Sequence, residues 1–82
     1  MTASDLRDLI CKMFLNGDTS FPIADDTHLL EEGICDSLGL VQMAAELEQR
    51  VPDLRIHDQE VTRENFATIA AILAFLTRKT RS

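Results

Sequence analysis

The serine at position 37 is the side chain in this sequence best placed to take part in chemistry. It follows Asp36 in the stretch ICDSLGLVQ, where an acidic loop gives way to an apolar-periodic run. A nucleophilic serine needs a base within hydrogen-bond reach and a group that orients this base. The only histidines, His28 and His57, lie in polar connecting stretches, and no Gly-x-Ser-x-Gly elbow surrounds Ser37. The pattern argues against a serine hydrolase, which we keep as the weakest alternative.

Two cysteines, Cys11 and Cys35, together with the two histidines would suit a zinc site by number, but their spacing matches no metal-ligand pattern. The sequence therefore predicts no metal site. Two cysteines are also too few for a disulfide scaffold, so we expect reduced thiols. We expect Cys35 to be a small apolar plug, because the neighbouring charge of Asp36 should raise the pKa of its thiol and make it less nucleophilic.

Ser37 is better suited to be the substrate of another enzyme than to be a catalyst itself. Asp36 at an N-cap position would accept a backbone hydrogen bond, and Ser37 would then be the first residue of a helix. Free backbone amides at a helix N-terminus favour an attached or approaching phosphate. Leu38 would add an apolar contact, and Gly39 removes side-chain bulk, so we expect open space around the hydroxyl. The simplest alternative is that Asp36 and Ser37 only cap the helix.

A helical framework must position this serine. Apolar spacing predicts three main helices and one short one, over residues 4–15, 37–50, 68–79 and 62–65. Ser4 is the expected N-cap of the first helix, Asn16-Gly17 is its stop signal, and Thr62 is the expected cap of the short helix. The sequence contains no strand-like alternation and no repeats. The predicted fold class is therefore all-α, a small four-helix bundle in a single domain over residues 1–82.

A long first loop, residues 18–36, precedes the serine. Loops of this length are uncommon inside compact domains unless they are functional or held to the core. Five apolar residues are expected to hold this one: Phe21, Ile23, Leu29, Leu30 and Ile34. We also expect a short helical turn near residues 27–31.

The length of 82 residues and the formal charge of −6 limit the classes of function. A chain this short can build one small core but has little left for a deep pocket, which favours a binding, carrier or interaction module over an enzyme. No Lys or Arg stands between Lys12 and Arg50, so the chain lacks the basic face of a nucleic-acid binder and should attract basic partners. It has neither a membrane-spanning run nor a signal peptide, and we expect a cytoplasmic protein.

The segment around Ser37 resembles the acyl, peptidyl and aminoacyl carrier proteins. The tripeptide DSL, residues 36–38, matches the site at which these carriers receive 4′-phosphopantetheine. Residues 26–48 look like the loop and second helix of the family, and residues 64–76 look like its third-helix end and fourth helix. The resemblance implies that a phosphopantetheinyl transferase moves the arm from coenzyme A to Ser37, and that Asp36 helps the transferase to position the site. The arm would carry a substrate as a thioester, and the chain itself would not be an enzyme.

In this family the second helix and the loop before it contact the partner enzymes. Carried over by position, the contact residues are Leu38, Val41 and Ala45, surrounded by Gln42, Glu46 and Glu48. The other implied partners are an acyl- or aminoacyl-loading ligase and a downstream transferase, and we expect a monomer. An open alternative is a helical protein-interaction module in which Ser37 is only a helix cap.

The type of carrier is indicated by the stretch DSLGLVQ, which looks closer to stand-alone aminoacyl and D-alanyl carriers. Gly39 and Gln42 stand where fatty-acid carriers usually have acids. Ile34-Cys35 stand where peptide-synthetase carriers often have glycines. Because the sequence begins at Met1 without a flanking linker, we expect a free-standing carrier. The cargo, an amino acid or another acyl group, stays open.

Overall fold

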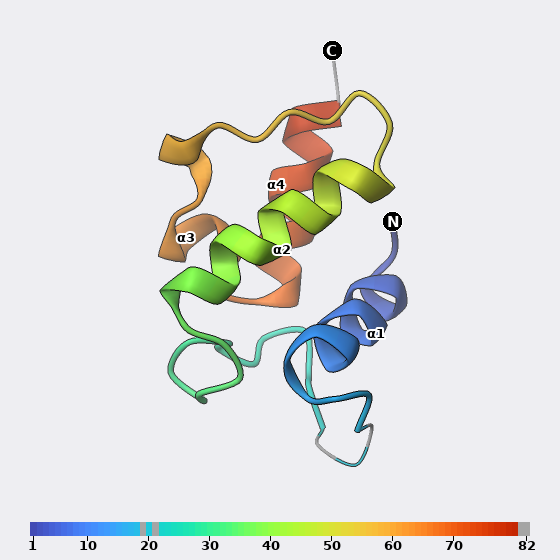
Figure 1. The fold of residues 1–82 in the computed structure, drawn as a ribbon, viewed down its shortest axis with the longest axis vertical. Helices are drawn as coiled ribbons and strands as arrows, with labels where there is room; N and C mark the ends of the chain where they lie inside the picture. Colours follow the sequence, from blue (N-terminus) through green and yellow to red (C-terminus); the bar gives the residue numbers. More distant parts are fainter. Residues whose placement is uncertain (19, 21, 81–82) are drawn as a thin grey trace.

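Four α-helices and one short 3-10 helix form the regular structure of the computed structural model, which describes residues 1–18, 20 and 22–80 (Figure 1). In chain order they are α1 (Ala3–Phe14), α2 (Ser37–Arg50), the 3-10 helix η1 (Asp58–Glu60), α3 (Arg63–Phe66) and α4 (Ile69–Thr80). No strand occurs in this part of the chain, so the predicted all-α class and the small helical bundle are confirmed. None of its helices is long and apolar enough to cross a membrane.

One apolar core fills the space between the three long helices. Residues with no exposed surface come from each of them: Leu6 and Ile10 of α1, Met43 and Leu47 of α2, and Ile69 and Ile72 of α4. The rings of Phe66 and Phe75 lie in the same core with their centroids 5.5 Å apart. Burying one large apolar side chain contributes roughly 1.5–3 kcal/mol, so these contacts fix the inner face of α2. The opposite face of α2 is then left to solvent.

The first helix begins earlier than the sequence suggested. Thr2, and not Ser4, is its N-cap: the Thr2 hydroxyl accepts from the Asp5 amide at 3.1 Å, and the Asp5 carboxylate accepts from the Thr2 amide at 3.0 Å. This reciprocal pair is a capping box, which a Ser4 cap could not form because Ala3 and Ser4 already lie in the helix. The expected stop at Asn16 is confirmed, since Asn16 has a φ of 54°.

The long first loop is held by hydrogen bonds to helices on both sides of it. Arg7 of α1 donates its Nε to the carbonyl of Ile23 at 2.7 Å. The Leu29 amide donates to the Ala67 carbonyl at 2.8 Å, between α3 and α4. Four of the five expected apolar residues pack in or against the core, namely Ile23, Leu29, Leu30 and Ile34, whereas Phe21 lies outside the described residues. From Ile23 onward these contacts hold the loop on the core as it leads to the serine.

The helical turn expected near residues 27–31 is present as a single turn that is not continued into a helix, because the Glu32 amide donates to the His28 carbonyl at 2.9 Å. The hydrogen-bonded turn covers residues 29–33. The turn closes at Gly33, whose φ of 72° lies in the left-handed region that glycine adopts without strain. The amide of Ile34 then donates back to the Leu29 carbonyl at 2.9 Å, which directs the chain toward Asp36.

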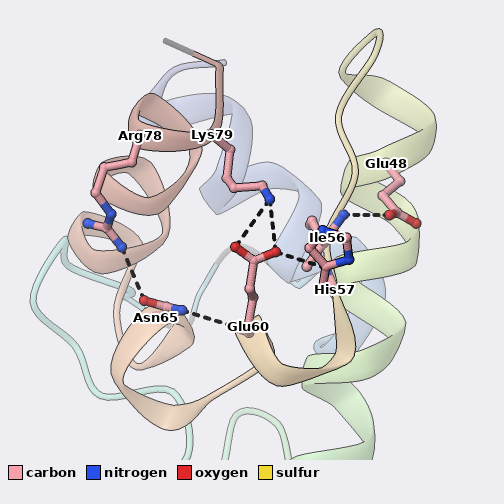
Figure 2. A network of polar contacts seen from close by, with 7 residues as sticks. All are labelled: Glu48, Ile56, His57, Glu60, Asn65, Arg78 and Lys79. Atoms are coloured by element: carbon pink, nitrogen blue, oxygen red, sulfur yellow. Dashed lines mark hydrogen bonds and ion pairs between the residues drawn. The ribbon is translucent and has the colours of Figure 1, made fainter. Parts of the chain in front are cut away.

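A network of polar contacts joins η1, α3 and the end of α4 (Figure 2). The carboxylate of Glu60 receives the Lys79 ammonium at 2.9 and 3.1 Å and the His57 amide at 2.9 Å. Asn65 donates to the Glu60 carbonyl at 2.9 Å and accepts from Arg78 at 3.2 Å. The hydrogen bond from the His57 backbone and then the one from Lys79 lower the pKa of Glu60 below its ordinary value of 4.5. The network fixes α3 on α4, which the sequence had not predicted.

The remaining boundaries are close to the prediction. Thr62 caps α3 as expected, because its hydroxyl accepts from the Asn65 amide at 3.2 Å. The short helix itself covers Arg63–Phe66, and α4 covers Ile69–Thr80, each one residue later than the sequence indicated at its C-terminal end. The short 3-10 helix Asp58–Glu60 lies between α2 and α3, where no helix was expected from the sequence.

Candidate functional site

Ser37 lies on the surface as the first residue of α2, at the bounds the sequence predicted. Asp36 precedes it in an extended conformation, and its Oδ1 accepts from the Gly39 amide at 2.8 Å, so the predicted N-cap is confirmed. One of the free amides of the first turn is thus satisfied. The others keep the positive end of the helix dipole next to the serine hydroxyl.

An open hollow of about 640 Å³ lies beside Ser37. Four segments line it: the end of α1 with Phe14, the turn of the first loop, the start of α2, and the start of α3 with Arg63. In Figure 1 the N-terminal end of α2 and the short helix α3 lie on the same side of the molecule. The lining from the loop and α2 is mixed, with the apolar Leu30 and Leu38 beside polar groups such as Gln42.

The open space expected around the Ser37 hydroxyl is present and Gly39 is among the residues that line it, but the missing side chain of Gly39 also has a second role. Gly39 is buried, and a Cβ at this position would lie 2.9 Å from Cε1 of Phe14 and 3.0 Å from Cβ of Cys35. The missing side chain allows the end of α1 and the loop to approach the first turn of α2. Gly39 therefore allows close packing at this point. The walls of the hollow beside Ser37 form where these segments meet.

Cys35 lies two residues before Ser37 and is almost completely buried, with 9% of its surface exposed. Burial is the main cause that raises the pKa of its thiol, and the charge of Asp36 adds to it. A thiol with a raised pKa is a poor nucleophile at neutral pH. Cys11 is also buried, and both cysteines are free. In the described part of the chain no three His, Cys, Asp or Glu residues gather in a way that could hold a metal ion.

Neither histidine is placed to activate Ser37. His28 accepts the Glu31 amide at its Nδ1, at 3.2 Å, within the turn of the first loop. His57 precedes η1 and its backbone belongs to the network of Figure 2. Neither of them lines the hollow. The Ser37 hydroxyl is thus exposed, and neither histidine shares the hollow with it.

The outer face of α2 presents apolar side chains to solvent. Leu38 is 64% exposed and Val41 54% exposed, while Gln42 and Ala45 are exposed beside them. We call these four residues the α2 face. Val41 and Ala45 are thus not core residues. Exposed leucine and valine on one helical surface can pack against another protein.

The two predicted contact acids of α2 differ from each other. Glu46 pairs with Arg50 one turn later, with Oε1 and Nε 3.0 Å apart. Glu48 is half-buried, and its carboxylate accepts the Ile56 amide at 2.7 Å (Figure 2). Glu48 therefore fixes the chain that follows α2. This use of the carboxylate depends on a contact eight residues away, which the helical spacing could not reveal.

Arg63 is a residue of the site that the sequence did not indicate. Among the described residues that line the hollow, it is the only Lys or Arg. It lies 26 positions after Ser37, as the first residue of a four-residue helix, and no local motif connects the two. Only the way α3 packs places Arg63 at the same hollow as the serine.

No model of a known protein family matches this chain, and a search of curated proteins found no match. Function is therefore inferred from an exposed serine at a capped helix start, an open hollow beside it and an exposed apolar face on the same helix.

Proposed function

We propose that this chain is a carrier protein whose Ser37 receives a 4′-phosphopantetheine arm and carries an acyl or aminoacyl group on it as a thioester. The observation that supports the proposal most is the exposed Ser37 at the start of α2, capped by Asp36 and adjoining an open hollow. The tripeptide DSL at this position, in a small acidic helical bundle, agrees with it.

The chemistry of attachment suits this site. In the proposed reaction the Ser37 oxygen attacks a phosphorus of coenzyme A, a phosphodiester forms, and the adenosine bisphosphate part of the coenzyme leaves. The serine proton passes to a base of the transferase, because neither histidine of this chain lines the hollow and the Asp36 carboxylate accepts the Gly39 amide. The positive end of the α2 dipole stabilises the negative charge that stays on the phosphodiester. The chain thus acts as a substrate of the transferase.

Partner enzymes would bind the α2 face. Its exposed Leu38 and Val41 offer apolar area, and the stretch from residue 13 to residue 49 contains acids but no Lys or Arg. Such a field favours encounter with enzymes whose docking surface carries Lys and Arg, mainly by raising the association rate. We propose the phosphopantetheinyl transferase, a ligase that loads the arm, and a downstream transferase as these partners.

The class of cargo is proposed to be an amino acid or a small acyl group. Two departures from the acidic second helix of fatty-acid carriers suggested this, Gly39 and Gln42. The packing against Phe14 explains Gly39 without reference to cargo. Gln42 is exposed on the α2 face, so it alone reduces the acidic charge offered to a partner.

The test is an intact mass measurement after incubation of the apo protein with coenzyme A and a broad-specificity phosphopantetheinyl transferase. We expect the wild type to gain one phosphopantetheine and Ser37→Ala to gain none. Ser4→Ala removes another exposed serine hydroxyl at a helix start and should be modified like the wild type. An unmodified wild type, or an adduct that persists in Ser37→Ala, would contradict the proposal.

The α2 face on its own also fits a protein-interaction module in which Ser37 is only a cap. That function requires partner binding to survive Ser37→Ala and to be lost when Leu38 and Val41 are both changed to Ser. It also requires that protein from the native host has no arm. A serine hydrolase would turn over activated esters without any modification, and we expect no such activity.

A further inference from the structure

We propose that Arg7 is a positioning residue for the modification of Ser37, because it holds the first loop in the arrangement from which α2 begins. This inference rests on the proposed function, since it concerns the attachment of the arm. It adds a residue of α1 that does not line the hollow and is not part of the α2 face. The effect of Arg7 on the serine therefore passes through the loop between them.

Arg7 contacts the first loop at two points. Its Nε donates to the carbonyl of Ile23 at 2.7 Å, and its Nη2 forms an ion pair with Oδ1 of Asp25. The two side chains of the ion pair are 36% and 58% exposed, so the pair alone contributes little. The bond to Ile23 is part-buried, and its charged donor makes it stronger than a hydrogen bond between neutral groups. Arg7 therefore ties this part of the loop to α1 mainly through the Ile23 carbonyl.

The segment that Arg7 holds also contacts the start of α4. The carbonyl of Asp25 accepts the Ala70 amide at 3.0 Å, and the Leu29 amide donates to the Ala67 carbonyl at 2.8 Å. The first amides of a helix have no intrahelical partner, so the loop supplies the acceptor for Ala70. Asp25 is thus held from two sides, by the side chain of Arg7 and by the backbone of α4.

The carbonyl of Leu29 connects this region to the serine. Leu29 has no exposed surface, and its carbonyl accepts the Ile34 amide at 2.9 Å and the Cys35 amide at 3.2 Å. Cys35 is followed directly by Asp36, the cap of α2, and then by Ser37. A shift of Leu29 would move the acceptor that holds the two residues before the cap. The contacts of Arg7 are therefore linked to the start of α2 by a continuous series of hydrogen bonds.

This linkage predicts how the loss of Arg7 affects the proposed transferase. The enzyme acts on Ser37 at the end of the loop, so it binds the chain in which the loop is docked. When part of the molecules have an undocked loop, the KM rises by the inverse of the docked fraction. The bound chain is docked in every case, so kcat stays the same. A residue that only added to overall stability would leave both constants unchanged as long as the chain stays folded.

The first measurement is the kinetics of arm attachment, followed by intact mass at several concentrations of the apo chain. Arg7→Gln removes the charge and shortens the side chain, so the ratio of docked to undocked loop should fall roughly tenfold or more. The KM of the transferase for this variant should then rise at least about twofold, with half or fewer of the molecules docked. Arg7→Lys keeps the charge beside Asp25 and should recover part of the wild-type KM. Asp25→Ala removes only the ion pair and should raise the KM less than Arg7→Gln.

The second measurement compares amide NMR spectra of the apo proteins. In Arg7→Gln the amides of Leu29, Cys35 and Ser37 should shift, although all three lie far from position 7 in the sequence. The amide of Leu47, a fully buried residue inside α2, should keep its shift and so show that the fold persists. Asp25→Ala should shift the same loop amides to a smaller extent, so the inference is tested even where Arg7→Gln does not fold.

Arg50→Gln is the matched control, because it removes an equal charge and breaks another half-exposed ion pair, the one with Glu46, outside the first loop. It should neither raise the KM nor shift the amide of Leu29. Arg7→Gln with the KM and loop amides of the wild type, a lower kcat at unchanged KM, or an equal rise of KM in Arg50→Gln would each overturn the inference while the carrier function stands. A wild type that accepts no arm would overturn the proposed function and this inference with it.

Discussion

Replacing Gly39 by Ala tests whether the first turn of α2 is built around a missing side chain. The added Cβ would lie 2.9 Å from a ring carbon of Phe14 and 3.0 Å from Cβ of Cys35, well inside the contact distance of carbon atoms. The ring can rotate away, but Cβ of Cys35 is attached directly to the backbone, so relief there requires the loop to shift. Overpacking of this kind costs roughly 1–3 kcal/mol.

Helix propensity acts in the opposite direction. Alanine is better than glycine inside a helix by at most about 1 kcal/mol. The net change in the free energy of unfolding of Gly39→Ala should thus be a loss of about 1 kcal/mol, with overpacking winning. For a domain of this size that loss corresponds to a fall in Tm of roughly 4–8 °C.

Urea unfolding followed by circular dichroism measures this change directly. Gln42→Ala, at an exposed position three residues later in the same helix, is the control and should stay within about 0.5 kcal/mol of the wild type. The double variant Phe14→Leu/Gly39→Ala should lose less than the sum of its single variants, because a smaller side chain at position 14 relieves one contact. A Gly39→Ala protein more stable than the wild type would refute the packing role of Gly39.

Three further predictions concern the cap, the apolar face and the polar network. Asp36→Ala should lower the free energy of unfolding by about 0.5–2 kcal/mol, because the Gly39 amide loses its acceptor. Asp36→Asn should keep most of the wild-type stability, because its side-chain oxygen can still accept this hydrogen bond. Thermal unfolding of both variants measures the difference. Leu38→Ser and Val41→Ser should each change the free energy of unfolding by no more than about 0.5 kcal/mol, since both side chains are exposed. Each should raise the KM of the phosphopantetheinyl transferase for this chain. An unchanged KM for both variants would count against the α2 face as its binding surface. Because the folded pKa of Glu60 lies below its ordinary value of 4.5, its contribution to stability is present above that pH and is lost as the pH falls through the lowered folded pKa. Urea unfolding at a series of pH values from neutral to acid should show that the free energy of unfolding falls less for Glu60→Gln than for the wild type. An equal fall in both proteins would show that the network of Figure 2 does not hold this carboxylate.

The features of α2 that depend on neighbouring residues were predictable from the sequence. Its bounds and its Asp36 cap follow from an N-cap residue placed directly before an apolar-periodic run, and both are found as predicted. The cap of α1 was predicted wrongly, because either Thr2, paired with Asp5, or Ser4 could act as the N-cap. The sequence alone does not show which of the two is used. The capping box with Asp5 decided in favour of Thr2.

Features that depend on distant residues were not predictable in the same way. Gly39 looked like a space-making residue until Phe14, from another helix, was seen to pack on it. Glu48 looked like a surface acid, but it accepts the amide of Ile56. No feature of the sequence indicated that Arg63 belongs to the site, since its place at the hollow comes from the packing of a four-residue helix.

The hydrogen bonds of the first loop to the region around α4 have a consequence for peptide tags. The amide of Leu29 reaches the carbonyl of Ala67, and the amide of Ala70 reaches the carbonyl of Asp25, so the turn before the serine is shaped by residues some forty positions downstream. A synthetic peptide covering residues 26–50 would contain the serine, its cap and the whole second helix and still lack this clamp. If the chain is the proposed carrier, a transferase should label such a fragment far less efficiently than the intact chain, although the fragment keeps the DSL tripeptide.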